Sequence, residues 1–193
     1  MTTPRISVVV PSYQRLHLLH RCLAALAQSD LPAREFEIVV VHDGPSKAVR
    51  RLVQCWRSKL ESSGGPEVRY RSPRHNGPAA ARNVGWRIAR GEIVAFTDDD
   101  TVPDAGWLSS ALAAFDARGL DAAWGKIVMP LGLQPTDYEL DAARLGQAEF
   151  ATANCFCRKR VLEDVGGFDE RFAIAWREDS DLYFRLLAAG ARV

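Results

Sequence analysis

The stretch that decides the fold reads Gly91-Glu-Ile-Val-Ala-Phe-Thr-Asp-Asp-Asp-Thr-Val-Pro-Asp-Ala-Gly-Trp107. Its apolar residues 93–96 stand between a glycine and a turn, which predicts a short buried strand. Three carboxylates, Asp98, Asp99 and Asp100, follow directly, and like charges this close are tolerated only in water or around a cation. A proline then precedes apolar residues at helical spacing, so a helix is expected next.

Clustered carboxylates at the end of a strand and before a helix are typical of the edge where open α/β sheets bind ligands. Carboxylate oxygens are ligands that Mg²⁺ and Mn²⁺ prefer, and such ions usually act on phosphates. The alternative is a solvated acidic turn that caps the following helix. The stretch alone leaves both interpretations open.

Strand and helix patterns alternate along the first 118 residues. Apolar runs at 6–10, 36–41, 68–71 and 93–96 predict strands, and apolar side chains at helical spacing follow each run. This alternation predicts an α/β fold, a mostly parallel open sheet with helices on both faces. The polar residues that come after the strands are Ser12, Asp43, Asn76 and Asp98. Because the carboxyl ends of parallel strands meet at one edge, these residues should line one crevice.

The pattern is less regular after Gly119. A strand is expected at 122–129, an irregular or weakly helical flap at 130–147 and another strand at 150–157. A last helix should open near 176–181, where acidic residues suit the helix dipole even without a further role. Residues 191–193 resemble the start of a strand that the sequence does not contain, so we expect a chain cut short at its C-terminus.

Composition and charge exclude several classes of protein. The 193 residues, 47% apolar and 25% charged, suit a soluble domain with a substantial core. A net charge of +1 predicts no nucleic-acid partner, and no apolar run reaches the roughly 18 residues of a membrane span. Four cysteines without a C-x-x-C pair, and no signal peptide, favour a cytoplasmic protein with reduced thiols. The basic helix expected at 46–60 either lies on the inner face of an anionic membrane as a peripheral contact or is a solvated face.

Five motifs resemble those of the family-two glycosyltransferases of the GT-A fold, the Rossmann-like fold of nucleotide-diphospho-sugar transferases. In chain order they are Val9-Val-Pro-Ser-Tyr-Gln-Arg15, Val41-His-Asp-Gly44, Asn76-Gly with Ala81-Arg-Asn83, Phe96-Thr-Asp-Asp-Asp100 and Arg177-Glu-Asp179. The similarity covers nearly the whole chain, and five motifs in register are specific although each alone is weak. It implies one GT-A catalytic domain over residues 1–193, with a nucleotide-binding half at 1–119 and an acceptor-side half at 120–193.

The resemblance also implies roles for individual residues. Those expected to contact the nucleotide are Pro11, Ser12, Tyr13, Arg15, Asp43, Arg82, Asp98 and Asp99. Asp98 and Asp100 would bind the divalent metal, Mg²⁺ or Mn²⁺, while Asp179 would be the catalytic base with Glu178 beside it. Candidates for contact with the acceptor or the donor sugar are Asn154, Gly166, Gly167 and Trp176. Three alternatives stay open: Trp176 in the core, Arg82 paired with the acid cluster alone, and His42 as either a determinant of base preference or a structural histidine.

The implied reaction moves a sugar from a nucleotide-diphosphate sugar, a UDP-sugar in the first place, to an acceptor hydroxyl with inversion. A divalent ion neutralises the leaving diphosphate. A placed carboxylate takes the proton of the hydroxyl, which is worth about 10²–10⁴-fold in rate. The sugar, the acceptor and the oligomeric state do not follow from the sequence.

Two other functions also account for part of the pattern. Residues 94–102 fit the strand-D-x-D-x-T/V motif of haloacid-dehalogenase-type phosphatases, with Asp98 as nucleophile and Asp100 as acid/base. That assignment would leave Asp43 and the Pro-Ser-Tyr loop unexplained, and the absence of G-x-x-x-x-G-K-S/T gives an ATPase no support. The other alternative is a non-catalytic domain that binds a nucleotide sugar, which donor binding without turnover would distinguish.

Overall fold

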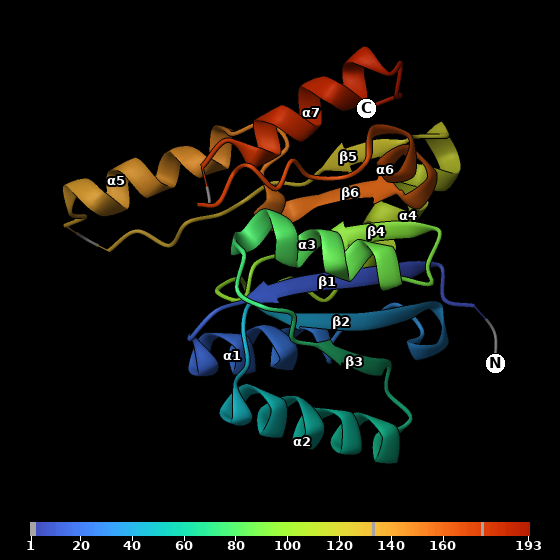
Figure 1. Cartoon of the computed structure of the whole chain (residues 1–193), viewed down its shortest axis with the longest axis vertical. Helices are drawn as coiled ribbons and strands as arrows, with labels where there is room; N and C mark the ends of the chain where they lie inside the picture. The colour runs from blue at the N-terminus through green and yellow to red at the C-terminus, as the bar shows by residue number, and fades with distance from the viewer. Residues whose placement is uncertain (1–2, 133, 175) are drawn as a thin grey trace.

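A six-stranded sheet forms the centre of the computed structural model, which describes residues 3–132, 134–174 and 176–193. The strand order is β3-β2-β1-β4-β6-β5 (Figure 1). The strands are β1 (Ile6–Ser12), β2 (Phe36–His42), β3 (Glu67–Arg71), β4 (Ile93–Phe96), β5 (Ala122–Trp124) and β6 (Cys155–Arg158). The first four pair in parallel, and β6 runs antiparallel to both of its neighbours, β4 and β5. The predicted mostly parallel open sheet is confirmed.

Helices cover both faces of the sheet, as the alternation predicts. One hydrophobic cluster packs Val8, Ile38 and Ala95 against three helices, α1 (Leu16–Leu26), α2 (Lys47–Ser63) and α4 (Trp107–Arg118). A second cluster packs Val9 and Val39 against α3 (Gly77–Ile88), α6 (Lys159–Val165) and α7 (Glu178–Ala188). Because successive strand residues point to opposite faces, a strand covered on both sides is apolar along most of its length. This explains the continuous apolar runs of the sequence.

Most helix boundaries in the first half agree with the sequence signals. Ser46 caps α2 as expected, since its Oγ accepts a hydrogen bond from Val49 N at 3.3 Å. Two predictions were wrong. The helical spacing predicts Leu16 on the buried stripe of α1, but its side chain is exposed, and the sequence predicts that the next helix opens at Pro103, whereas α4 begins at Trp107. The basic side chains of α2 face solvent. No helix in the described part of the chain is long and apolar enough to cross a bilayer, and all four cysteines are free thiols.

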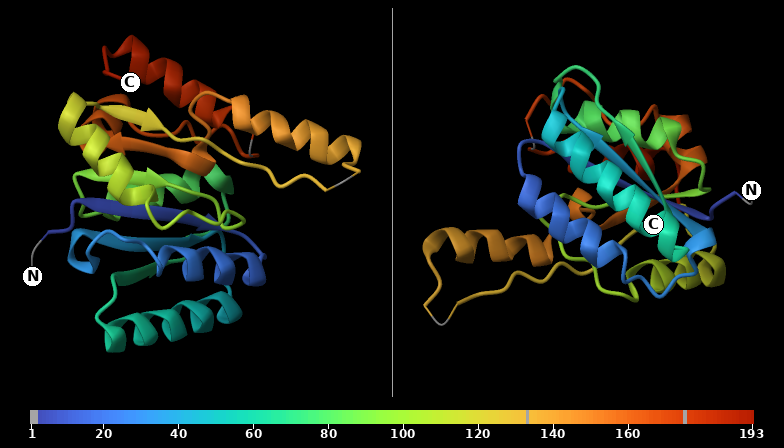
Figure 2. Two further views of the ribbon diagram at one scale, coloured as in Figure 1. Left: turned by 180° about the vertical axis from the view of Figure 1, so that it is seen from behind. Right: turned by 90° about the horizontal axis from the view of Figure 1, so that it is seen from below.

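The second half departs more from expectation. The strand expected at 122–129 ends at Trp124. Gly125 N still bonds to Asn154 O at 3.0 Å, but the carbonyl of the next residue, Lys126 O, accepts from the Asn154 side chain at 3.0 Å and the chain leaves the sheet. The strand expected at 150–157 starts only at Cys155, after a 3-10 turn (Thr152–Asn154). The stretch 130–147, apart from residue 133 outside the described residues, contains α5 (Asp137–Ala143) and a 3-10 turn (Arg144–Gln147). Helix α5 projects away from the sheet in every view (Figures 1 and 2).

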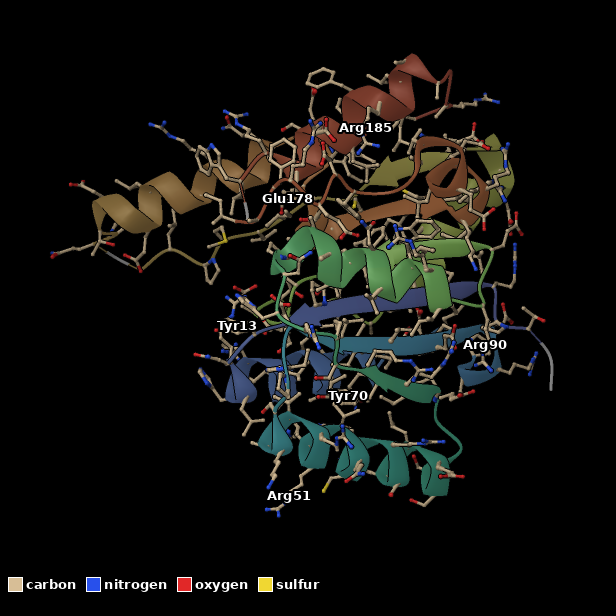
Figure 3. The ribbon with its side chains drawn as sticks, viewed as in Figure 1. Tyr13, Arg51, Tyr70, Arg90, Glu178 and Arg185 are labelled. Atoms are coloured by element: carbon tan, nitrogen blue, oxygen red, sulfur yellow. The ribbon has the colours of Figure 1, made fainter. Side chains whose placement is uncertain are left out.

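The amino-terminal end of the sheet holds a buried ionic cluster that is separate from the predicted crevice. Glu37 on β2 accepts hydrogen bonds from Ser7 Oγ at 2.7 Å, from Arg90 N at 2.7 Å and from Arg90 Nε at 2.9 Å. Burial alone would raise the pKa of Glu37, but these hydrogen bonds outweigh it and lower the pKa. Figure 3 places Arg90 at the opposite end of the sheet from Tyr13. The cluster therefore ties β1 and β2 to the end of α3.

Candidate functional site

A cavity of about 230 Å³ opens where β1, β2 and β4 end and α3 begins. It is lined by Pro11, Ser12, Tyr13, Arg15, Asp43, His75, Gly77, Pro78, Ala81, Arg82, Asp98 and Ala173. Three of the four polar residues that follow strands, Ser12, Asp43 and Asp98, thus line one crevice as the sequence predicts. Asn76 reaches the same place through its backbone, which bonds to Asp43.

The loop after β1 forms the aromatic wall of the cavity. The Tyr13 ring stacks on His75, with 4.8 Å between ring centroids and 22° between the planes. Ser12 Oγ is buried and has no hydrogen-bond partner in the described part of the chain. A flat aromatic surface beside a free hydroxyl suits a planar, polar ring. Sequence reasoning did not select His75; its position directly before the Asn-Gly start of α3 was the available signal.

Asp43 connects β2 to the start of α3. Its Oδ1 accepts a hydrogen bond from Asn76 N at 2.9 Å, and its Oδ2 accepts one from Gly77 N at 3.0 Å and lies 2.7 Å from His75 Nδ1. The carboxylate therefore satisfies the free amides at the start of this helix. A carboxylate oxygen has two acceptor positions, so Asp43 keeps capacity for a ligand. Gly77 is required here, because its φ is +88° and a Cβ would lie 2.4 Å from Ala173 O.

His42 is held entirely by the protein. Its Nδ1 donates to Gly44 O at 2.5 Å, and its Nε2 accepts from Gln14 N at 3.4 Å. Both ring nitrogens are used, and the side chain is buried. The geometry favours the structural interpretation of His42 over a role in base preference.

A buried ion triad joins α3, the end of β4 and α7. Arg82 Nη2 donates to Asp98 Oδ1 at 2.7 Å, and Arg82 Nη1 donates to Glu178 Oε1 at 2.9 Å. Arg82 is only 3% exposed. Burial raises the pKa of Glu178 despite the neighbouring guanidinium, while the two carboxylates raise the pKa of Arg82 against the effect of its own burial. Figure 3 shows Glu178 at the start of α7, above the beginning of α3.

The acid cluster is already neutralised in part by arginine. Asp99 is 0% exposed, and Arg15 Nη2 lies 2.8 Å from its Oδ1. Arg15 Nη1 donates to Asp100 Oδ2 at 2.6 Å. Burial raises the pKa of Asp99, and the nearby Ser12 hydroxyl and the Arg15 charge offset this effect only in part. Among the described residues no three His, Cys, Asp or Glu side chains are arranged as a ready metal site. The sequence did not predict that Arg15 would face these carboxylates.

Asp179 lies half-buried in the first turn of α7. Its Oδ1 accepts a hydrogen bond from Ser180 N at 2.7 Å. Two residues on, Asp181 pairs with Arg185 one turn later, with Oδ2 accepting from Nε at 2.8 Å. The three acidic residues at the start of this helix therefore differ in their surroundings. Glu178 belongs to the buried ion triad, Asp179 is half-buried, and Asp181 forms an ion pair on the helix surface.

Four residues were predicted to contact the acceptor or the donor sugar. Gly166 ends α6 in the left-handed conformation, with a φ of +78°, and the other three lie in different surroundings. Asn154 is used internally, since its Oδ1 accepts from Trp107 Nε1 at 2.8 Å and its Nδ2 donates to Lys126 O at 3.0 Å. Gly167 is buried, and a Cβ there would lie 2.5 Å from Asn83 Oδ1, so the structure gives it a packing role. Trp176 is 67% exposed, which excludes the core alternative.

Asn83 organises the neighbouring loop, a role the sequence did not reveal. Its Oδ1 accepts hydrogen bonds from Trp86 Nε1 at 2.8 Å and Phe168 N at 2.9 Å. Its Nδ2 donates to Phe168 O and to Glu170 Oε1, both at 2.8 Å. The Phe168 ring thus stays close to Arg82, with 5.8 Å between the guanidinium carbon and the ring centroid. Asn83 therefore fixes the position of Phe168, whose ring packs against Arg82 of the triad.

This chain is similar in sequence to known glycosyltransferases. The pre-mycofactocin glycosyltransferase of Mycobacterium tuberculosis is 32% identical over 203 residues, which cover 97% of this chain and 40% of that protein. Glycosyltransferase AglE of Haloferax volcanii is 26% identical over 176 residues, which cover 86% of this chain and 57% of that protein. The chain spans about half the length of the curated relatives it matches.

Solved structures share the fold. The mannosyltransferase PcManGT of Pyrobaculum calidifontis, in complex with GDP-Man and Mn²⁺, has a TM-score of 0.74 at 24% identity and covers 100% of this chain and 54% of its own. TarS of Staphylococcus aureus in complex with UDP-GlcNAc has a TM-score of 0.73 at 25% identity, covering 94% of this chain and 52% of its own. The model of glycosyl transferase family 2 matches residues 7–165. The chain therefore belongs to glycosyl transferase family 2.

Proposed function

We propose that this chain is the catalytic domain of an inverting glycosyltransferase that moves a sugar from a nucleotide-diphosphate sugar to an acceptor hydroxyl. The observation that carries the proposal is the single cavity in which Ser12, Tyr13, Asp43 and Asp98 meet. These residues come from three motifs of the family resemblance, at the ends of β1, β2 and β4, and they meet at the edge where α/β sheets bind nucleotides.

The donor nucleotide occupies this cavity. Its base lies against Tyr13, within reach of Ser12 Oγ and the remaining acceptor positions of Asp43, and a UDP-sugar is the donor we propose first. The support is the stacked Tyr13–His75 wall and the buried, unpartnered hydroxyl of Ser12. TarS, which shares the fold, holds UDP-GlcNAc.

The acid cluster fits Mg²⁺ or Mn²⁺ in its chemistry. Asp98 and Asp100 offer hard oxygen ligands, and both are partly exposed, at 27% and 44% of the side chain. The remaining ligands of such an ion are usually substrate phosphates and water, so two carboxylates suffice. The ion would neutralise the leaving diphosphate, and Arg82 would hold Asp98 in a fixed orientation through their 2.7 Å hydrogen bond.

Asp179 is the proposed general base. Its carboxylate is half-buried and engaged on one oxygen by Ser180, which leaves the other oxygen for an acceptor hydroxyl. Glu178 next to it is held by Arg82, so the start of α7 is fixed relative to the acid cluster that would bind the metal. Trp176, two residues before the helix, offers an exposed aromatic face for a sugar.

Slow donor hydrolysis tests the proposal without knowledge of the acceptor. Incubated with Mn²⁺ and a panel of UDP- and GDP-sugars, the protein is expected to release the nucleoside diphosphate from one donor, with water as acceptor and with inversion at the anomeric carbon seen by NMR. Asp100→Ala should lose this release, whereas Asp104→Ala, an exposed aspartate in the same loop, should keep it.

Two results would contradict the proposal. Vanadate-sensitive hydrolysis of a generic phosphate ester, abolished by Asp98→Asn, would identify a phosphatase instead. Metal-dependent nucleotide binding without turnover of any donor would identify a binding domain.

A further inference from the structure

Arg15 stands between the aromatic loop and the acid cluster. It is the residue directly before α1, and its guanidinium lies 2.6 Å from Asp100 Oδ2 and 2.8 Å from Asp99 Oδ1. The Asp99 side chain is fully buried, and a buried carboxylate is costly without a nearby positive charge. Arg15 supplies that charge before any ligand arrives.

The two arginines of the acid cluster differ in their freedom to move. Arg82 is 3% exposed and is fixed by a second carboxylate, Glu178. The Arg15 side chain is 48% exposed and its partner Asp100 is 44% exposed, so this pair can separate at small cost. The guanidinium of Arg15 occupies Oδ2 of Asp100 and places a positive charge beside the rest of the carboxylate. A divalent ion that takes Asp100 as a ligand therefore competes with Arg15.

We propose that Arg15 is an exchangeable counter-ion, which holds Asp99 and Asp100 in the nucleotide-free protein and turns to the diphosphate of the donor when a divalent ion takes its place on Asp100. The inference rests on the proposed function. This exchange makes the metal and the nucleotide strengthen each other's binding. The divalent ion alone competes with the Arg15 guanidinium for Asp100, whereas the diphosphate of a bound nucleotide offers Arg15 another partner. By linkage, the metal strengthens nucleotide binding by the same factor.

The test is a titration of Mn²⁺ alone, with free Mn²⁺ measured by electron paramagnetic resonance, on wild type, Arg15→Met and Arg21→Met. Arg21 is an exposed arginine of the adjacent helix and serves as the matched control. Without nucleotide, Arg15→Met should bind Mn²⁺ about tenfold more tightly than the other two proteins, a difference that corresponds to a partly exposed ion pair with one buried member. With saturating UDP or GDP, the gain in Mn²⁺ affinity should be large in wild type and small in Arg15→Met.

Arg15→Gln, whose amide can still hydrogen bond to Asp99, repeats the comparison if Arg15→Met lowers the folded fraction seen by circular dichroism. Clear synergy in wild type with unchanged Mn²⁺ affinity in both Arg15 variants would overturn this inference and leave the proposed function standing. Failure of UDP, GDP, CDP and dTDP to bind the wild type, with or without Mn²⁺, would overturn both.

Discussion

Asp179→Asn is expected to slow sugar transfer by about 10²–10⁴-fold, the contribution of a positioned general base. Asparagine has nearly the shape of aspartate but cannot accept the acceptor's proton. The hydrogen bond from Ser180 N can pass to the amide oxygen, so the first turn of α7 keeps its geometry. Donor binding should therefore stay close to wild type while turnover collapses. Measuring single-turnover rates and donor affinity on the same preparation separates the two effects.

Asp181→Asn is the matched control for this change. It lies two residues further along the same helix turn and pairs with Arg185 on the helix surface, where an ion pair is worth less than about 1 kcal/mol. Its turnover should stay within a few-fold of wild type. An Asp179→Asn protein with near-normal turnover, or one that loses donor affinity in proportion to rate, would exclude Asp179 as the base.

Arg82→Met is expected to have the largest effect on stability. Removal of the guanidinium leaves Glu178 buried without its partner and takes one of the cations from the acid cluster. Loss of one member of a buried ion pair costs about 3–5 kcal/mol of unfolding free energy. Because Asp98 and the start of α7 also lose their common anchor, nucleotide affinity should fall even where the protein remains folded. Urea unfolding followed by circular dichroism measures the first effect, and calorimetry the second.

The pair Arg82 and Glu178 can be tested in a double-mutant cycle. Arg82→Met with Glu178→Gln should recover part of the lost stability, since the unpaired buried charge is then gone. Arg87→Met on the same helix removes an exposed pair with Glu170 and a contact of the guanidinium with the Trp86 ring, and it should cost about 1 kcal/mol. If Arg82→Met unfolds at the same urea concentration as Arg87→Met, the triad does not hold the two segments together.

The sheet and the crevice were predictable because they depend on local patterns. A strand buried on both faces is apolar along most of its length, and this pattern is visible in the sequences of β1, β2 and β4. Parallel pairing then places the carboxyl ends of these strands at one edge, so the sequence alone predicts that Ser12, Asp43 and Asp98 meet there.

The rest could not be read from local patterns, because it depends on contacts between distant residues. Strand β5 stops at Trp124 because the side chain of Asn154, far along the chain, donates to the carbonyl of Lys126 just after the strand. The approach of Arg15 to Asp99 and Asp100 joins residues more than 80 positions apart, and so does the approach of Gly167 to Asn83. A sequence motif indicates which residues meet, but not which of their atoms are already engaged by the protein.

The most direct test of the central claim is a calorimetric titration of UDP, GDP, CDP and dTDP, each with and without Mn²⁺, on wild type and Asp100→Ala. The account predicts one nucleotide bound per chain, in the presence of Mn²⁺, with affinity lost in Asp100→Ala. Binding of none of the four nucleotides, or binding that neither Mn²⁺ nor Asp100→Ala alters, would contradict a metal-assisted nucleotide-sugar site at this edge of the sheet.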